Sequence, residues 1–195
     1  GRIELRPNIH SLARLYIEPT TRCNLACQTC IRNTWNEPLG DMDEGTFRRL
    51  VSQLGAFPHL ETVMFGGFGE PMAHPRILEM VQTVRASGVR VEMTTNGTLL
   101  QGDLLDGLVR TGLDRLWVSF DGADEARFES IRTGARFRSV VENLERLRKL
   151  NRKRKRPLAV GISFVVMKKN VDDLVAMDEL ARTIGADRIL VSNVL

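Results

Sequence analysis

The sequence predicts an α/β fold, a partial (β/α)6 TIM-like barrel built on a parallel sheet. Short β-rich runs alternate with amphipathic segments along the whole chain, and this alternation is typical of repeated βαβ units. Because the crossovers of such units are right-handed, a series of them curls in one direction. Ligands of these folds bind at the carboxyl ends of the strands, so the residues after each strand are the candidate functional residues.

Six segments are predicted strands, and the segments between them have a helical period. Phe47, Leu50, Val51 and Leu54 are spaced i, i+3, i+4, i+7, which places them on one face of a helix. Five intervening helices are expected, and Gly107 interrupts the pattern of the third. The predicted strands are 15–18, 62–65, 89–95, 115–120, 158–166 and 188–194, and the other predicted helices cover 77–84, 103–110, 140–147 and 174–184.

Length and composition are those of one ordinary globular domain. The chain has 195 residues, of which 43% are hydrophobic and 27% charged, and this is enough to build a substantial core. No apolar run is long enough to cross a bilayer, and no signal peptide opens the chain. We therefore expect a single domain over residues 1–195, a cytoplasmic location and no membrane partner.

The modest net charge of +4 comes mostly from one basic run, residues 152–156. Such a run can contact phosphates, but it also suits a solvated helix end, where cations interact favourably with the helix dipole. No aromatic residue that could stack on a base interrupts the run. The second interpretation is favoured, and no nucleic-acid partner is expected.

The three cysteines of the chain, Cys23, Cys27 and Cys30, lie within eight residues. Such a cluster is a poor disulfide framework and indicates a metal site. Three thiolates on one loop can ligate three irons of a cubane cluster and leave the fourth iron open. A structural zinc site is an alternative that needs a fourth ligand, and His10, His59 and His74 are all distant in sequence.

The cysteine spacing Cx3Cx2C, directly after the first strand, resembles the signature of the radical S-adenosylmethionine (SAM) superfamily. The resemblance implies a 4Fe–4S cluster on Cys23, Cys27 and Cys30, whose open iron chelates the amino and carboxylate groups of SAM. It also implies reductive cleavage of SAM to a deoxyadenosyl radical that abstracts hydrogen from a substrate. An electron donor such as ferredoxin or flavodoxin is then a partner.

The motif after the second strand resembles the Gly-Gly-Glu motif of this superfamily. Residues 66–71 read Gly-Gly-Phe-Gly-Glu-Pro, so Phe68 stands where the family has the first glycine. The resemblance implies that Gly67, Gly69 and Glu70 hold the ammonium group of SAM. A carboxylate is a good charge-assisted partner for an ammonium group.

Polar residues also follow the third and fourth strands. Asn96 belongs to an Asn-Gly pair that a simple turn also explains, and the resemblance places it near SAM. Ser119 and Asp121 are two residues apart, which in a strand places them on the same face. The resemblance implies ribose contacts for both, whereas a helix cap is the alternative role for Asp121. No catalytic residue of the protein itself is assigned.

Residues 16–42 and 65–77 most closely resemble the maturases of tungsten-cofactor oxidoreductases. This resemblance implies a role in maturing a peptide, a protein or a tungsten or molybdenum cofactor, with a peptide or protein as a further partner. Such relatives continue into a cysteine-rich SPASM-type extension, and this chain has no cysteine after Cys30. We expect residues 1–195 to be a core domain without that extension. The alternative function is a zinc-stabilised α/β binding module without redox chemistry.

Overall fold

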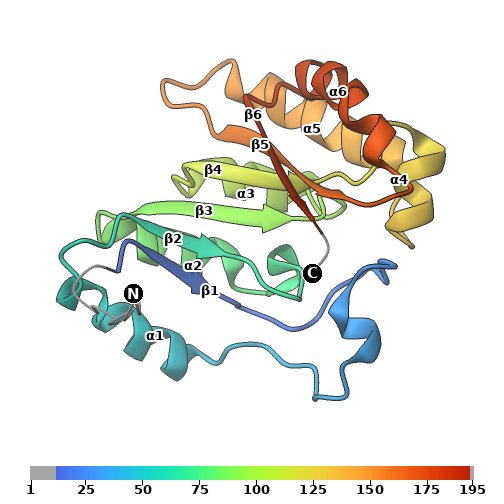
Figure 1. The fold of residues 1–195 in the computed structure, drawn as a ribbon. Helices are drawn as coiled ribbons and strands as arrows, with labels where there is room; N and C mark the ends of the chain where they lie inside the picture. Colours follow the sequence, from blue (N-terminus) through green and yellow to red (C-terminus); the bar gives the residue numbers. More distant parts are fainter. Residues whose placement is uncertain (1–11, 194–195) are drawn as a thin grey trace, which may run out of the picture.

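The computed structural model describes residues 12–193 and shows one parallel sheet that curves into a half-barrel (Figure 1). The six strands follow one another in sequence order, and each pairs in parallel with the next. The helices lie on the outer, convex face of the sheet. The predicted α/β partial barrel is therefore confirmed.

The strands agree closely with their predicted ranges. Each observed boundary lies within one residue of the predicted one, and Val194, the last residue of the predicted sixth strand, lies outside the described residues. The strands are β1 (Arg14–Ile17), β2 (Thr62–Phe65), β3 (Arg90–Thr95), β4 (Arg115–Ser119), β5 (Ala159–Val166) and β6 (Arg188–Asn193).

The prediction of five helices is wrong, because the crossover from β4 to β5 contains two helices. The first ends at Ile131, and the chain then turns through Gly134, whose φ of 98° favours glycine. The second begins at Phe137. The α-helices are α1 (Glu44–Ser52), α2 (Ile77–Ala86), α3 (Gly102–Arg110), α4 (Glu125–Ile131), α5 (Phe137–Asn151) and α6 (Ala176–Ile184).

Gly107, which interrupts the sequence pattern of α3, has a packing role. A Cβ atom at this position would lie 2.4 Å from Cδ1 of Leu78 on α2. The glycine therefore lets α3 approach α2 closely, and this contact compensates for its low helix propensity. None of the helices in the described part of the chain has the length and apolar character needed to cross a membrane.

The hydrophobic core lies between the sheet and the helices. Phe65, Val91 and Val118 are fully buried on the outer face of their strands. Alternate residues such as Thr94 and Trp117 face the concave side and are only partly buried. The concave side and the carboxyl ends of the strands are therefore the surfaces available for ligands.

Candidate functional site

A cavity of about 540 Å³ lies at the carboxyl ends of the strands, and we call it the cysteine cavity. Its walls come from the loops after β1, β2 and β3, from the ends of β3 and β4, from the end of α4 and from β5 and β6. The predicted site residues that line it are Cys23, Cys27, Cys30, Gly67, Gly69, Glu70, Asn96 and Ser119. The fold thus brings together residues that are almost 100 positions apart in sequence.

One side of the cysteine loop is fastened to the segment before α1. Thr20 pairs with Asp41 in an isolated antiparallel bridge, and its hydroxyl donates to the Asp41 carboxylate at 2.6 Å. The backbone N–H of Thr21 donates to the carbonyl of Gly40 at 2.9 Å. These contacts hold the chain in a defined path just before the first cysteine.

The other side of the loop is fastened to the end of α4. The N–H groups of Ala26 and Gln28 donate to the carbonyls of Thr133 and Ile131 at 3.0 and 2.9 Å. These bonds bracket Cys27 in the sequence. The loop is therefore held by backbone bonds on both sides, as a preformed ligand loop requires.

The three cysteines are free thiols that are each partly exposed to the cavity. The sulfur of Cys23 accepts from the N–H of Leu25 at 3.5 Å and from the side-chain amide of Asn96 at 3.8 Å. Burial raises the pKa of the Cys27 thiol. The two neighbouring cysteines raise this pKa as well, whereas the positive charge of Arg132 lowers it. Hydrogen bonds to ligand sulfurs are among the features that tune an iron–sulfur cluster.

The zinc alternative needs a fourth ligand beside the three cysteines. Among residues 12–193, no three His, Cys, Asp or Glu side chains converge as the ligands of a single metal ion would. His74 is occupied elsewhere, since its ring contacts the carbonyl of Met42 and the N–H of Arg76, and His10 lies outside the described residues.

The glycine-rich loop after β2 packs directly against the cysteine loop. A Cβ atom at Gly69 would lie 1.9 Å from the carbonyl oxygen of Thr20 and 2.9 Å from that of Arg22. The N–H of the next residue, Glu70, donates to the Arg22 carbonyl at 2.8 Å. Gly69 is therefore required by close backbone contact.

We expect Gly69→Ala to separate the two loops, because the added methyl group would overlap the backbone of Thr20. The free energy of unfolding should fall by about 1–3 kcal/mol, the usual cost of overpacking, and iron uptake should fall as well. Gly55→Ala is the matched control, since a Cβ there has no neighbour within 4 Å. Denaturant unfolding and iron analysis after anaerobic reconstitution would test this, and identical values for both variants would contradict it.

Glu18, which the sequence analysis did not select, holds the same glycine-rich loop. Its Oε1 accepts from the N–H of Phe68 at 2.5 Å and from that of Gly69 at 3.2 Å. At Gly67, where φ is 138°, a Cβ atom would lie 2.5 Å from this carboxylate. The position of Glu18 at the end of the first predicted strand was the only signal in the sequence.

Glu70 is buried, and its carboxylate is held by three donors from the neighbouring loops. Oε1 accepts from the N–H of Met72 at 3.0 Å and from the Thr95 hydroxyl at 2.7 Å, while Oε2 accepts from the N–H of Asn96 at 2.7 Å. Burial raises the pKa of Glu70, although these bonds act in the opposite direction. Oε2 accepts one bond and retains acceptor capacity toward the cavity.

Asn96 links the third strand to the cysteine loop. Its side-chain amide donates to Oδ1 of Asn24 at 3.0 Å, in addition to its contact with Cys23. Its own oxygen accepts from the N–H and the hydroxyl of Thr98, at 2.9 and 2.7 Å. Both the nitrogen and the oxygen of the Asn96 amide are therefore held in place. Asn96 forms a turn and also lies beside the cysteines, so the two interpretations of the Asn-Gly pair are compatible.

Ser119 and Asp121 differ in their access to the cavity. Ser119 lines the wall, whereas Asp121 is 1% exposed and accepts from the N–H of Val165 at 2.9 Å. Asp121 lies just beyond the end of β4 at Ser119, and the same-face expectation stays a prediction. The helix-cap alternative does not hold, since Asp124 caps α4 by accepting from the N–H of Arg127. The ribose roles of Ser119 and Asp121 stay predictions.

Arg132 is a site residue that the sequence analysis missed. Its guanidinium pairs with the Asp121 carboxylate at 2.7 Å, and its side chain is only 11% exposed. It lines the cysteine cavity, and its Nε is buried with no hydrogen-bond partner among the described residues. A buried cation with an unused donor is costly unless a ligand completes it. Arg132 is therefore a candidate anion-binding residue.

The Radical SAM superfamily profile matches residues 17–181. The chain belongs to the radical SAM superfamily. The members of this superfamily use a 4Fe–4S cluster and SAM, and structures of members with bound SAM are among the solved structures similar to this radical SAM chain.

Curated relatives of this radical SAM chain act on cofactors and peptides. One is the tungsten-containing aldehyde ferredoxin oxidoreductase cofactor-modifying protein of Pyrococcus furiosus, 35% identical over 93% of the chain and 51% of the relative. The AdoMet-dependent heme synthase of Methanosarcina barkeri is 30% identical over 87% and 47%. The PqqA peptide cyclase of Gluconobacter oxydans is 33% identical over 92% and 48%. The chain spans about half the length of these relatives.

Solved structures support the fold of this radical SAM chain. SuiB of Streptococcus suis bound to S-adenosylmethionine superposes with a TM-score of 0.78 over 95% of the chain and 41% of SuiB, at 17% identity. Methylornithine synthase PylB gives a TM-score of 0.74 over 95% and 54%, also at 17% identity. At this level of identity, the comparison supports the half-barrel fold and no statement about function.

The residues of the cysteine cavity fit the two cofactors of the family. Three free thiols face one cavity and match the three ligands of a cluster with one open iron. Arg132 has an unsatisfied buried donor that suits a carboxylate, and Glu70 has acceptor capacity that suits an ammonium group. These are the two charged groups of the methionine part of SAM.

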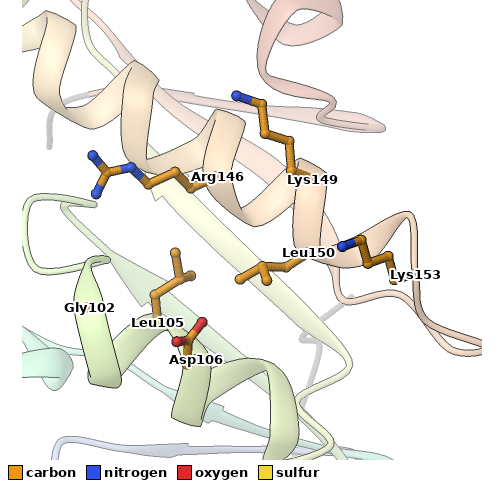
Figure 2. A pocket seen from close by; sticks show the side chains of 7 residues that line it. All are labelled: Gly102, Leu105, Asp106, Arg146, Lys149, Leu150 and Lys153. Carbon is orange, nitrogen blue, oxygen red and sulfur yellow. The ribbon is translucent and has the colours of Figure 1, made fainter.

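A second cavity of the radical SAM chain lies on the outer helices and contains none of these residues. This helix groove, of about 390 Å³, lies between α3 and α5. Figure 2 shows Leu105 and Leu150 pointing into the space between the helices, with Arg146, Lys149 and Lys153 along one side. The basic run at 152–156 thus begins at the end of α5, as the helix-end interpretation expects.

Proposed function

We propose that this protein is a radical SAM enzyme that cleaves SAM reductively and uses the resulting radical to abstract hydrogen from a substrate. The observation that carries the proposal is the convergence of three free thiols, Glu70 and Arg132 on one cavity at the carboxyl ends of the strands. When bound, the 4Fe–4S cluster supplies the electron that breaks the sulfonium bond of SAM. The protein supplies the geometry and the exclusion of water.

In this proposal Cys23, Cys27 and Cys30 hold the cluster. Glu70 accepts a hydrogen bond from the SAM ammonium, and Arg132 donates from Nε to the SAM carboxylate. Both are charge-assisted bonds in a buried place, where such bonds are strongest.

The remaining predicted residues position the loops and the nucleoside. Ser119 contacts the ribose, and Asp121 positions the guanidinium of Arg132, to which it is paired. Gly67 and Gly69 let the glycine-rich loop pack closely on Glu18 and on the cysteine loop, and Asn96 holds the cysteine loop in place. These residues position the cofactors, and no acid or base of the protein is assigned to the hydrogen abstraction.

An aromatic pair, Phe68 and Trp35, lies at the wall of the cysteine cavity. Phe68 lines the cavity, and its ring contacts Trp35 edge to face, with centroids 5.5 Å apart. Phe68 is still 49% exposed, so it has apolar surface to bury against a ligand. We assign to Phe68 and Ile31 the apolar contact with adenine, because Thr29 offers a smaller surface beside the last cysteine.

We place the protein in the maturation of a peptide, a protein or a tungsten or molybdenum cofactor. The cofactor-modifying relative and the PqqA peptide cyclase support these substrate classes, as does the structure of SuiB bound to precursor peptide SuiA. The proposal includes a cytoplasmic location, an electron donor such as ferredoxin or flavodoxin, and a single core domain over residues 1–195.

The proposal predicts that the protein, reconstituted anaerobically with iron and sulfide, releases 5′-deoxyadenosine and methionine from SAM when dithionite is added. Liquid chromatography of the products and the visible absorption of the cluster would measure both. Binding of zinc without iron would favour the binding-module alternative. A fully loaded cluster with no SAM cleavage would contradict the proposed activity.

A further inference from the structure

A separate cavity of about 580 Å³ lies on the concave face of the sheet, and we call it the inner cavity. Thr94 lines both this cavity and the cysteine cavity. Ser163 of the inner cavity is also in register with Ser119 of the cysteine cavity on the neighbouring strand. The two cavities therefore adjoin, and a ligand of the inner cavity lies next to the cofactor site.

The floor of the inner cavity contains a fixed indole ring, that of Trp117. Its Nε1–H donates to Oε2 of the buried Glu92 at 2.9 Å. A Cβ atom at Gly161 would lie 2.5 Å from the ring, so the indole packs on bare backbone. The guanidinium carbon of Arg115 lies 5.2 Å from the ring centroid. These three contacts hold the indole in one orientation, so the part of Trp117 that lines the cavity is a preformed surface for a planar group.

Two cations from the opposite edge strands, Arg14 of β1 and Arg188 of β6, line the same cavity. Arg14 lies 3.4 Å from Glu92, whose Oε2 is shared with Trp117. Within residues 12–193, Arg188 has no ion-pair partner, because the adjacent Asp187 is held by both terminal nitrogens of Arg115. Among the described residues that line the cavity, Arg14 is paired with Glu92, and the unpaired charge of Arg188 suits an anionic ligand.

We propose that the inner cavity binds the substrate through a planar, aromatic group stacked on Trp117 and an anionic group, carboxylate or phosphate, held by Arg14 and Arg188. This inference rests on the proposed function, since it places the substrate beside SAM. It concerns binding alone and assigns no step of the reaction. Guanidinium groups suit both anions because their fork of donors matches two oxygens.

The test uses the reconstituted holoprotein with saturating SAM, which keeps Arg132 and the cysteine cavity occupied. Calorimetric titration with GMP, guanosine and ribose 5-phosphate separates the planar part from the anionic part. Orotate and uracil form the corresponding pair for a carboxylate. We expect GMP or orotate to bind at least tenfold more tightly than its uncharged counterpart, about the effect of one charge-assisted hydrogen bond.

Arg188→Gln is expected to weaken binding of the preferred anion about tenfold and to leave guanosine or uracil unchanged. The variant is expected to fold, because Arg188 is exposed. Arg146→Gln, in the helix groove, removes the same charge elsewhere and is the matched control (Figure 2). Trp117→Leu should weaken every planar ligand and leave ribose 5-phosphate unchanged.

The inference is overturned if charged and uncharged ligands bind equally, if none of them binds, or if Arg146→Gln has the same effect as Arg188→Gln. If only GMP binds more tightly than its uncharged counterpart, the anionic group of the ligand is a phosphate. If only orotate does so, the anionic group is a carboxylate. SAM cleavage in the absence of substrate is measured in the same preparations. This measurement tests the proposed radical SAM activity separately from anion binding in the inner cavity. Cleavage without anion binding contradicts this inference only, and anion binding without cleavage contradicts the proposed function only.

Discussion

Replacing Cys23, Cys27 and Cys30 together by alanine is expected to abolish cluster assembly and the release of 5′-deoxyadenosine. The chain contains no other cysteine, so no thiolate remains to replace a lost ligand. A single replacement leaves two thiolates, and we expect it to reduce iron content strongly and SAM cleavage below detection. Iron and sulfide analysis, visible absorption and product chromatography under anaerobic conditions would measure these effects.

The control for the cysteine variants is Thr29→Ser in the same loop. Thr29 is exposed between the second and third cysteines, so its replacement should leave iron content and cleavage unchanged. The apo proteins should all unfold at similar denaturant concentrations, because backbone bonds from Ala26 and Gln28 to the end of α4 hold the loop. Wild-type iron content in the triple variant would refute the cluster assignment.

The fold could be predicted from the sequence because its elements depend on local patterns. Period-2 and period-3.6 hydrophobic patterns follow from the direction of side chains in strands and helices. The hydrophobic pattern did not predict α4, because only Phe128 and Ile131 are buried in this helix and two residues are too few to show a period. The turn at Gly134 depends on its positive φ, which no neighbouring residue signals.

The candidate site could be predicted only in part. The cysteines and Glu70 belong to compact motifs, so their spacing carried the information. Arg132 acts through a pairing with Asp121 eleven positions earlier in sequence, and Glu18 acts on a loop 50 positions away. Such contacts arise from tertiary structure, and an arginine on a helix end has no local pattern that separates it from a solvated one.

Arg132→Gln is expected to have two separable effects, one on folding and one on SAM binding. Without the guanidinium, the buried Asp121 carboxylate keeps only the hydrogen bond from Val165. Removal of one partner of a buried ion pair costs about 3–5 kcal/mol, so the variant should unfold at a lower denaturant concentration. Loss of the Nε donor should also weaken SAM binding at least tenfold, as one charge-assisted bond implies.

The double variant Asp121→Asn, Arg132→Gln distinguishes these effects. With both charges removed, no unpaired charge stays buried, and most of the lost stability should return, as a double-mutant cycle would show. The SAM affinity should not return, because the donor to the carboxylate is still missing. Arg136→Gln is the matched control, since its pair with Glu129 leaves Arg136 77% exposed and such pairs contribute about 0–1 kcal/mol.

Denaturant unfolding of the apo proteins and calorimetric titration of the reconstituted proteins with SAM would measure the two effects separately. Wild-type SAM affinity in the double variant would mean that Arg132 serves only to neutralise Asp121. Weak SAM binding in a double variant of restored stability would instead assign the unpartnered Nε to the ligand. The position of Arg132 between a buried carboxylate and the cysteine cavity then explains how one cation supports both the fold and the cofactor.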